Sequence, residues 1–218
     1  MAAVGEPSQI ENFVFFDLQT TGLPRRRDMP CITELCFLAL TRYQLTLTDL
    51  SQRAYNKLLL CFNPRKEIDE QASSISGLHR HSLEELKPFE EQTSLIHQFL
   101  KNLPHPVCLV AHNGNRFDFP LFLAHLKEWQ QMIPDDILCA DSMVAFRAFA
   151  AEAGVKGRQS YSLPKVYARV FGQEPPLPRT AEHNCNNMLE IIRETSIDKF
   201  PQWCDAKAVP LCSITPIY

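Results

Sequence analysis

Acidic and amide side chains follow apolar runs of the sequence, at the points where those runs end. Asp17 stands near the close of the run FVFFDL at residues 13–18, and Gln19 follows two residues later. Because side chains two positions apart on a strand point to the same side, Asp17 and Gln19 share one face. Such a pair can begin a metal site, although this segment alone favours Asp17 as a cap of the Thr-Thr-Gly turn that follows.

A second acid occupies a similar position further along the chain. Asp118 ends the segment NGNRFD, which follows the apolar run at residues 107–111 and opens an amphipathic stretch. Its carboxylate could complete a metal site with Asp17, or it could cap the N-terminus of the helix that starts there. Neither segment is specific by itself.

The elements that must position these side chains change in type along the chain. Continuous apolar runs predict strands at residues 13–18, 32–40, 57–62, 107–111 and 139–141. Amphipathic stretches predict helices at residues 118–131, 142–153, 162–171 and 181–195, with a further helix in 83–100 that Pro88 breaks or begins. Strands lead and helices follow, which indicates the α/β class with a mixed central sheet flanked by helices.

Length and composition are typical of one globular domain. We expect residues 1–218 to form it, with residues 1–11 as a flexible N-terminus. The 45% hydrophobic and 22% charged residues exclude a disordered chain. The formal net charge of −3 excludes a polybasic protein that coats nucleic acid through its overall field, but it leaves room for a local basic face.

The cysteines and the N-terminus bear on the compartment. Most of the eight cysteines lie in apolar stretches and none forms a C-x-x-C pair, which favours reduced core residues over a zinc site. The N-terminus has no basic region followed by an apolar run, and no segment approaches the length of a membrane span. We therefore expect a cytoplasmic or nuclear protein with no membrane contact.

Several segments together carry a resemblance to a known family. The sequences FFDLQTTGLP (15–24), VAHNGNRFDFPLF (110–122), RQSYSLPKVYARVFGQEPP (158–176) and RTAEHN (179–184) resemble the three-prime repair exonucleases of the DEDDh superfamily. SITPIY (213–218) resembles the end of their catalytic core. The resemblance implies a ribonuclease-H-like exonuclease fold and a homodimer joined edge to edge through its sheets. It also implies removal of nucleotides from DNA 3′ ends with two Mg²⁺ ions.

The resemblance assigns five catalytic positions, and three of them depart from the family pattern. Four carboxylates hold the metals in that family and a histidine activates the attacking water. The carboxylate positions correspond here to Asp17, Gln19, Asp118 and Asn184, and the histidine position corresponds to Arg179. Because Asp17 and Asp118 supply two negative charges where four would stand, we expect them to hold one weakly bound Mg²⁺ at most.

The arginine at the histidine position cannot replace the base. The guanidinium of Arg179 stays protonated and cannot accept a proton from water. Its cation is expected to form charge-assisted hydrogen bonds with Asp17 or Asp118 where a metal would otherwise sit. The alternative is that it swings out to a DNA phosphate. His183 is the nearby candidate for a base, but on a helix it projects about 100° away from Asn184.

The groups that would hold DNA depart less from the family. The resemblance implies contacts from Gln19, Thr20, Leu23, Ile75, Leu78 and Phe117. An apolar side chain can pack on the face of any base. Arg25 to Arg27 and the loop Lys156-Gly-Arg158 could contact phosphates, so Arg25 and Arg158 are included as candidates. A run of charges is equally typical of a solvated face.

Three functional hypotheses remain open. The first is an exonuclease fold that binds DNA 3′ ends, preferably single-stranded, but is catalytically dead or strongly impaired. The second is a working Mg²⁺-dependent 3′–5′ exonuclease, or an engineered inactive form of one. The third is a dimerisation partner of an active homologue. The strand predicted at residues 57–62 is the segment expected to pair with its own copy in a homodimer.

Overall fold

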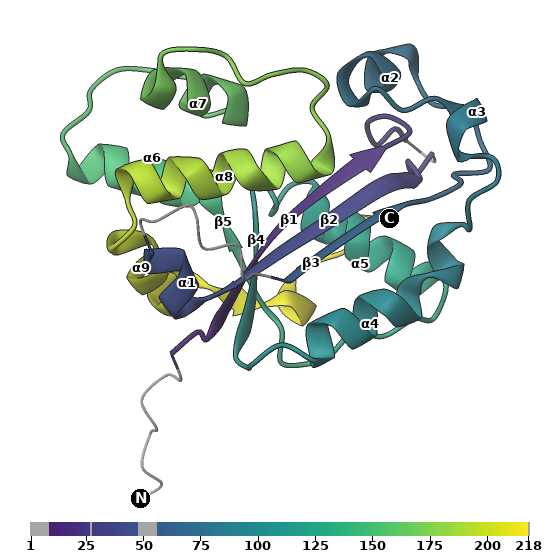
Figure 1. Ribbon diagram of the computed structural model, residues 1–218, viewed down its shortest axis with the longest axis horizontal. Coiled ribbons are helices and arrows are strands. Elements are labelled where there is room, and N and C mark those ends of the chain that lie inside the picture. Colours follow the sequence, from purple (N-terminus) through teal and green to yellow (C-terminus); the bar gives the residue numbers. More distant parts are fainter. Residues whose placement is uncertain (1–8, 27, 48–55, 218) are drawn as a thin grey trace, which may run out of the picture.

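A computed structural model describes residues 9–26, 28–47 and 56–217 of the chain. Within these residues six strands form one mixed sheet in the order β3-β2-β1-β4-β5-β6. The strands are β1 (Asn12–Thr20), β2 (Ile32–Thr41), β3 (Asn56–Cys61), β4 (Val107–Ala111), β5 (Leu138–Asp141) and β6 (Val209–Pro210). The long hairpin partners β1 and β2 run antiparallel, whereas β4 and β5 run parallel to β1 (Figure 1).

Helices cover both faces of this sheet. Their bounds are α1 (Arg42–Thr46), α2 (Glu70–Ser76), α3 (Arg80–Leu83), α4 (Thr93–Lys101), α5 (Asp118–Glu128), α6 (Ser142–Glu152), α7 (Leu163–Phe171), α8 (Ala181–Thr195) and α9 (Lys199–Lys207). Two short 3₁₀ helices, η1 (Phe89–Glu91) and η2 (Leu211–Ser213), complete the described elements. Figure 1 shows α6, α7 and α8 on one side of the sheet and α4 and α5 on the other.

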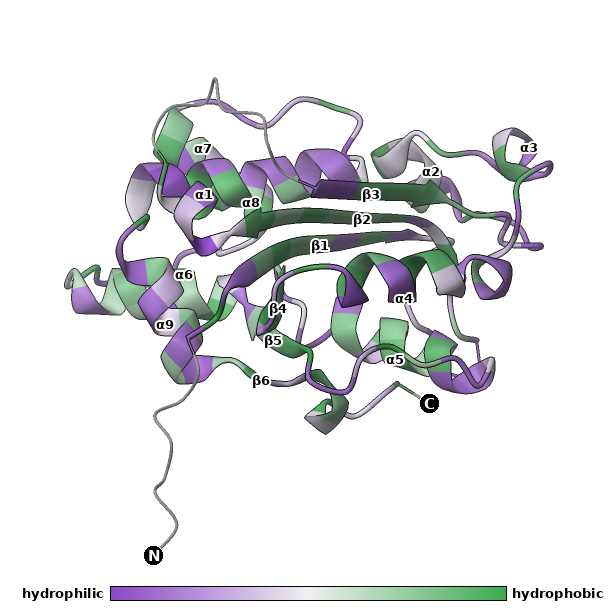
Figure 2. Cartoon of the chain, turned by 60° about the horizontal axis from the view of Figure 1, so that its bottom comes forward, coloured by the Kyte–Doolittle hydropathy of each residue, from purple (hydrophilic) through white to green (hydrophobic). Residues whose placement is uncertain are grey.

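The period of two along the strands divides the core into two apolar clusters. Phe13 and Phe15 of β1 point toward α8 and α9, whereas Val14 and Phe16 point toward α4 and α5. Because both faces are covered, the inner strands are mostly apolar, which is why β4 reads as an unbroken hydrophobic run and β2 as a hydrophobic run with Thr33 and Glu34 near its start. Figure 2 shows the same arrangement with the sheet seen between its helix layers. The predicted α/β fold with a mixed central sheet is confirmed.

The parallel strands bring the ends of two predicted motifs together. β1 pairs with β4 from Asn12 and Val107 onward, so the carboxyl ends of both strands lie at one edge of the sheet. Gln19 lies near that end of β1, and the loop that follows β4 leads to Asp118 at the start of α5. The fold therefore positions the two acid motifs beside each other, as the sequence predicts.

The predicted elements account for most of the chain but not for all of it. Helices α1, α2, α3 and α9 and the two-residue strand β6 are additional to the prediction, since α3 meets the predicted region 83–100 only at Leu83. Residues 1–8 of the expected flexible N-terminus lie outside the described residues, but Ile10 is buried and the amide of Glu11 donates to the carbonyl of Pro106. The chain is thus packed into the fold from residue 10 onward.

Candidate active site

The two acid motifs and the start of α8 enclose one cavity at the carboxyl ends of β1 and β4. This acid cavity has a volume of about 280 Å³. Its lining includes Asp17, Gln19, Asp118, Arg179, Asn184 and His112. All five positions that the family resemblance assigns to catalysis are therefore brought together by the fold.

Asp17 accepts hydrogen bonds from two side-chain amides. The Gln19 side-chain NH₂ donates to Asp17 Oδ2 at 2.8 Å. The Asn184 NH₂ donates to Oδ1 and Oδ2 at 3.2 and 3.1 Å. Burial and the negative charge of Asp118 raise the pKa of Asp17 well above its usual value, although the two amide donors oppose that rise.

Asp118 is held by the backbone of β1. Its Oδ1 accepts a hydrogen bond from the amide of Leu18 at 3.2 Å, and only 5% of the residue is exposed. Burial raises the pKa of Asp118 to about 7, and the charge of Asp141 adds a smaller contribution. Burial is thus the main cause of both raised pKa values, because a buried carboxylate resists ionisation.

The donor set of the acid cavity does not fit two divalent ions. Asp17 and Asp118 are the only carboxylates among the five family positions, and Mg²⁺ prefers charged oxygen ligands. Gln19 and Asn184 turn their NH₂ groups toward Asp17, and an NH₂ group cannot ligate a cation. No cluster of three or more His, Cys, Asp or Glu side chains in the described parts of the chain could hold a metal ion.

Arg179 lines the acid cavity but does not pair with either acid. Among the described residues its guanidinium makes no ion pair or hydrogen bond with Asp17 or Asp118, and its buried Nε has no partner. The prediction that Arg179 would bond to one of these acids is therefore wrong. The amides of Gln19 and Asn184 take up both oxygens of Asp17 instead, and the Leu18 amide takes up one oxygen of Asp118.

Neither histidine is placed to act as a base in the cavity, because His112 has both ring nitrogens occupied and His183 is not among the residues that line it. The Nδ1 of His183 lies 2.8 Å from the carbonyl of Pro178, which holds the ring toward the linker that precedes α8. His112 uses both ring nitrogens, with Nδ1 2.9 Å from Ser142 Oγ and Nε2 2.7 Å from the Tyr161 carbonyl. Burial also lowers the pKa of His112. The low weight that the sequence gives to His183 agrees with this arrangement.

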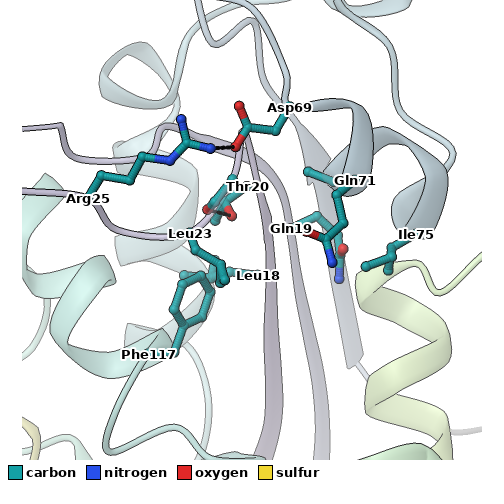
Figure 3. Close-up of a pocket in the computed structure, with 11 residues that line it drawn as sticks. Leu18, Gln19, Thr20, Leu23, Arg25, Asp69, Gln71, Ile75 and Phe117 are labelled. Atoms are coloured by element: carbon teal, nitrogen blue, oxygen red, sulfur yellow. Dashed lines mark hydrogen bonds and ion pairs between the residues drawn. The ribbon is translucent and has the colours of Figure 1, made fainter.

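A second cavity adjoins the acid cavity and collects most of the predicted DNA-binding residues. This outer cavity has a volume of about 330 Å³ and shares Leu18, Gln19, Ile75 and Phe117 with the acid cavity. Figure 3 shows Leu23 and Phe117 on one side of it and Ile75 and Gln71 on the other. Its lining includes the predicted residues Gln19, Thr20, Leu23, Arg25, Ile75 and Phe117.

An ion pair closes one end of the outer cavity. Arg25 Nη2 lies 2.7 Å from Asp69 Oδ2, and both side chains are well exposed (Figure 3). Asp69 also packs against Gly22, where a side chain would collide with its carboxylate, so a glycine is needed at this turn. The pair fixes the loop after β1 to the start of α2 and thereby shapes the mouth of the cavity.

Two predicted DNA-binding residues lie outside both cavity linings. Leu78 is half-buried just beyond α2, where its amide donates to Ser76 Oγ. Arg158 is exposed in the loop that precedes α7. Arg27, the last residue of the arginine run, lies outside the described residues.

The sequence analysis missed one buried acid beside the site. Glu34 of β2 pairs in register with Gln19 and is 5% exposed. Its Oε2 accepts the amide of Ala181 at 2.7 Å, so it anchors the first turn of α8, the helix that carries Asn184. Burial raises the pKa of Glu34. A single acid inside the ten-residue apolar strand was the available signal, because such residues are rarely buried without a specific partner.

Two further features bear on the cellular setting. All eight cysteines are free, and five of them are buried. Within the described part of the chain, no helix combines the length and the apolar character that crossing a membrane requires.

Comparison with known sequences gives consistent relatives, although no family model matches the chain. Three-prime repair exonuclease 1 of Bos taurus is 37% identical over 231 residues, which cover 97% of this chain and 72% of the relative. Three prime repair exonuclease 2 of Homo sapiens is 32% identical over 229 residues, which cover 99% of this chain and 96% of the relative.

Solved structures resemble the fold at much lower sequence identity. The nuclease domain of 3′hExo, a DEDDh family member bound to rAMP, aligns with a TM-score of 0.66 at 11% identity, covering 92% of this chain and 96% of that domain. A 3′-exonuclease that recognises the 3′ end of a histone mRNA stem-loop aligns with a TM-score of 0.67 at 12% identity, covering 97% and 95%. At these identities the structures support the fold alone.

Proposed function

The chain belongs to the three-prime repair exonucleases, and we propose that it binds DNA 3′ ends while cleaving them very slowly or not at all. Proteins of the DEDDh group generally use divalent metal ions. The observation that carries the proposal is the pair of amide donors from Gln19 and Asn184 to Asp17. They stand where the family resemblance expects metal-binding carboxylates, and Arg179 stands where it expects the base.

Binding and catalysis separate because they draw on different residues. Two-metal cleavage needs both ions clamped and a base that accepts a proton from water. Two carboxylates and a permanently protonated arginine meet neither need, so we expect one weakly held Mg²⁺ at most. The outer cavity keeps apolar side chains, among them Leu23, Ile75 and Phe117, that can pack on a terminal base.

The test compares binding and turnover on one substrate. Fluorescence anisotropy should show tighter binding to a linear single-stranded DNA with a free 3′ hydroxyl than to a circular DNA of the same sequence. The same linear DNA, incubated with Mg²⁺ or Mn²⁺ and resolved on a denaturing gel, should stay intact or shorten several orders of magnitude more slowly than with an active relative. Turnover at the relative's rate, abolished by a chelator, would favour the alternative of an active exonuclease. A matching RNA oligonucleotide decides between DNA and RNA.

We further propose a homodimer joined through β3. This strand lies at the edge of the sheet, and its residues are mostly exposed or half-buried. An edge strand offers unpaired backbone groups that a second copy can complete in a two-fold interface. The same edge would serve the alternative role, pairing with an active homologue. Light scattering at micromolar concentration that shows a mass near 25 kDa would contradict the homodimer.

The free cysteines support a reducing compartment. Disulfides are rare in the cytosol and nucleus, where thiols stay reduced. We therefore propose a cytoplasmic or nuclear location. Localisation of a tagged full-length chain by microscopy tests it.

A further inference from the structure

Arg179 lines the acid cavity but forms no ion pair with a carboxylate of the described residues. Its guanidinium lines the cavity together with Asp17, Asp118 and Asn184, and its Nε is buried without a hydrogen-bond partner. A buried donor that lacks an acceptor is costly, and a guanidinium keeps its charge. The Arg179 guanidinium can therefore donate to an oxygen acceptor that enters this cavity.

The backbone around Arg179 is fixed on both sides. The amide of Arg179 donates to the carbonyl of Ile75 at 2.9 Å, which ties this residue to the end of α2. The next residue, Thr180, caps α8 through a hydrogen bond from the amide of His183 to its Oγ1 at 3.1 Å. The side chain thus starts from an anchored position at the border of the two cavities.

The carboxylates of the cavity already have donors. Both oxygens of Asp17 accept amide hydrogens from Gln19 and Asn184, and Oδ1 of Asp118 accepts the amide of Leu18. Arg179 bonds to neither of these acids in the described structure, so its donors are available to an acceptor from outside the chain. A phosphate suits a guanidinium best, because its oxygens match the paired donors of the arginine fork.

We propose that Arg179 binds the phosphate of the 3′-terminal internucleotide linkage and so holds the DNA end in place. The inference rests on the proposed binding of DNA 3′ ends. The two cavities share Gln19, Ile75 and Phe117, so a terminal nucleotide in the outer cavity brings its phosphate to the acid cavity. Position 179, which the family resemblance assigns to the catalytic base, would then hold the uncleaved DNA end instead.

Chemical change of the DNA tests this without altering the protein. We compare a single-stranded oligonucleotide with a free 3′ hydroxyl, the same oligonucleotide with one neutral methylphosphonate at its 3′-terminal linkage, and a third with the methylphosphonate near its 5′ end. Anisotropy should show about a tenfold or larger loss of affinity for the 3′-terminal substitution and little change for the 5′ one. Equal affinity for all three oligonucleotides overturns the inference and leaves the proposed function standing.

Variants then assign the effect to this side chain. Arg179→Ala should lower affinity for the unmodified oligonucleotide about tenfold and should no longer distinguish the 3′-terminal methylphosphonate. Arg179→Lys keeps the charge without the fork and should fall between. Lys101→Ala removes one positive charge from an exposed position at the end of α4, on the other face of the sheet, and serves as the matched control.

The remaining outcomes are decisive as well. A wild-type protein that binds no linear oligonucleotide overturns the proposed function, and the inference fails with it. An Arg179→Ala variant that binds as tightly as wild type and still distinguishes the methylphosphonate overturns the inference alone. If Arg179→Ala does not fold, as judged by circular dichroism, Arg179→Lys and the modified oligonucleotides still decide the question.

Discussion

The side-chain amide of Asn184 donates hydrogen bonds to both carboxylate oxygens of Asp17, across the gap between α8 and β1. A carboxylate at position 184 would repel Asp17 unless a cation lay between them. No cation is needed between Asp17 and an asparagine, because the NH₂ group is neutral and donates hydrogen bonds to the carboxylate. Gln19 acts in the same way. The hydrogen bonds around Asp17 thus follow from an NH₂ group in place of a carboxylate oxygen on each of two side chains.

Exonuclease activity should return only when all three departures from the family pattern are reversed together. The triple variant Gln19→Glu, Arg179→His, Asn184→Asp rebuilds four carboxylates and a base, and it should digest single-stranded DNA with Mg²⁺. Each single reversion should recover little, because groups that act as one unit are strongly non-additive. Initial rates on a labelled oligonucleotide measure this. Strong recovery from a single reversion would contradict it.

Mg²⁺ should stabilise the native protein only slightly. A ligand that binds the folded state raises the melting temperature according to its concentration relative to its Kd, so a weak site responds little. We expect a thermal shift with millimolar Mg²⁺ close to that of Asp17→Asn, and a clearly larger shift for the double variant Gln19→Glu, Asn184→Asp. A large shift in the native protein that Asp17→Asn abolishes would contradict this prediction.

Leu23 should contribute to DNA binding without contributing to stability. It is 71% exposed and lines the outer cavity, so removing its side chain costs little packing in the free protein. Leu23→Ala should weaken binding to a DNA 3′ end by about 1 kcal/mol, the low end for side chains that pack on a base. Met132→Ala, at a residue 70% exposed beyond α5, is the matched control. Anisotropy and thermal melts measure the two effects separately.

Regular elements could be predicted from the sequence where the local signals agree. The run at β4 and the helix at α8 match their predicted bounds, because an apolar run fixes the first and a capping Thr180 starts the second. Helix α9 was missed because Pro201 and charged residues obscure its periodicity, although a proline in the first turn is compatible with a helix. Local patterns therefore sufficed for β1 to β5, but not for the two-residue strand β6.

The contacts within the site could be predicted only in part. The resemblance brought Asp17, Gln19, Asp118, Arg179 and Asn184 into one cavity, and the structure does so too. The expectation that Arg179 would bond to Asp17 or Asp118 was wrong, because the donor to Asp17 depends on competition among three side chains from β1, the linker and α8. The two amides reach the carboxylate, and Arg179 does not.

The edge strand β3 should govern the oligomeric state. Leu59 is 39% exposed on this strand. In a two-fold interface through β3, the Leu59 side chains of the two copies would lie close to each other. Leu59→Lys should dissociate the proposed homodimer, because like charges would then face each other across the pair. Leu95→Lys, on α4 at a residue 48% exposed, should leave the dimer intact. Light scattering of both variants against the native protein provides the measurement.

The stability of the fold should fall as pH rises from 4 to 8, and Asp118 should be a main cause. Its pKa is about 7 in the folded protein, against about 3.8 for an ordinary aspartate, so the folded state holds a proton that the unfolded chain has lost. The stabilisation is complete below about pH 4 and is lost as pH rises through 7, by up to about 4 kcal/mol.

A neutral replacement separates this effect from other pH dependence. Asp118→Asn keeps an oxygen for the Leu18 amide, removes the charge, and also relieves its repulsion of Asp17. Relative to the native protein, the variant should therefore gain stability at pH 8 and change little at pH 4. Asp135→Asn, at an exposed position, should show no such pH-dependent gain. Urea unfolding at both pH values measures the difference, and an Asp118→Asn variant that loses stability at pH 8 would show that the carboxylate is held there by a cation.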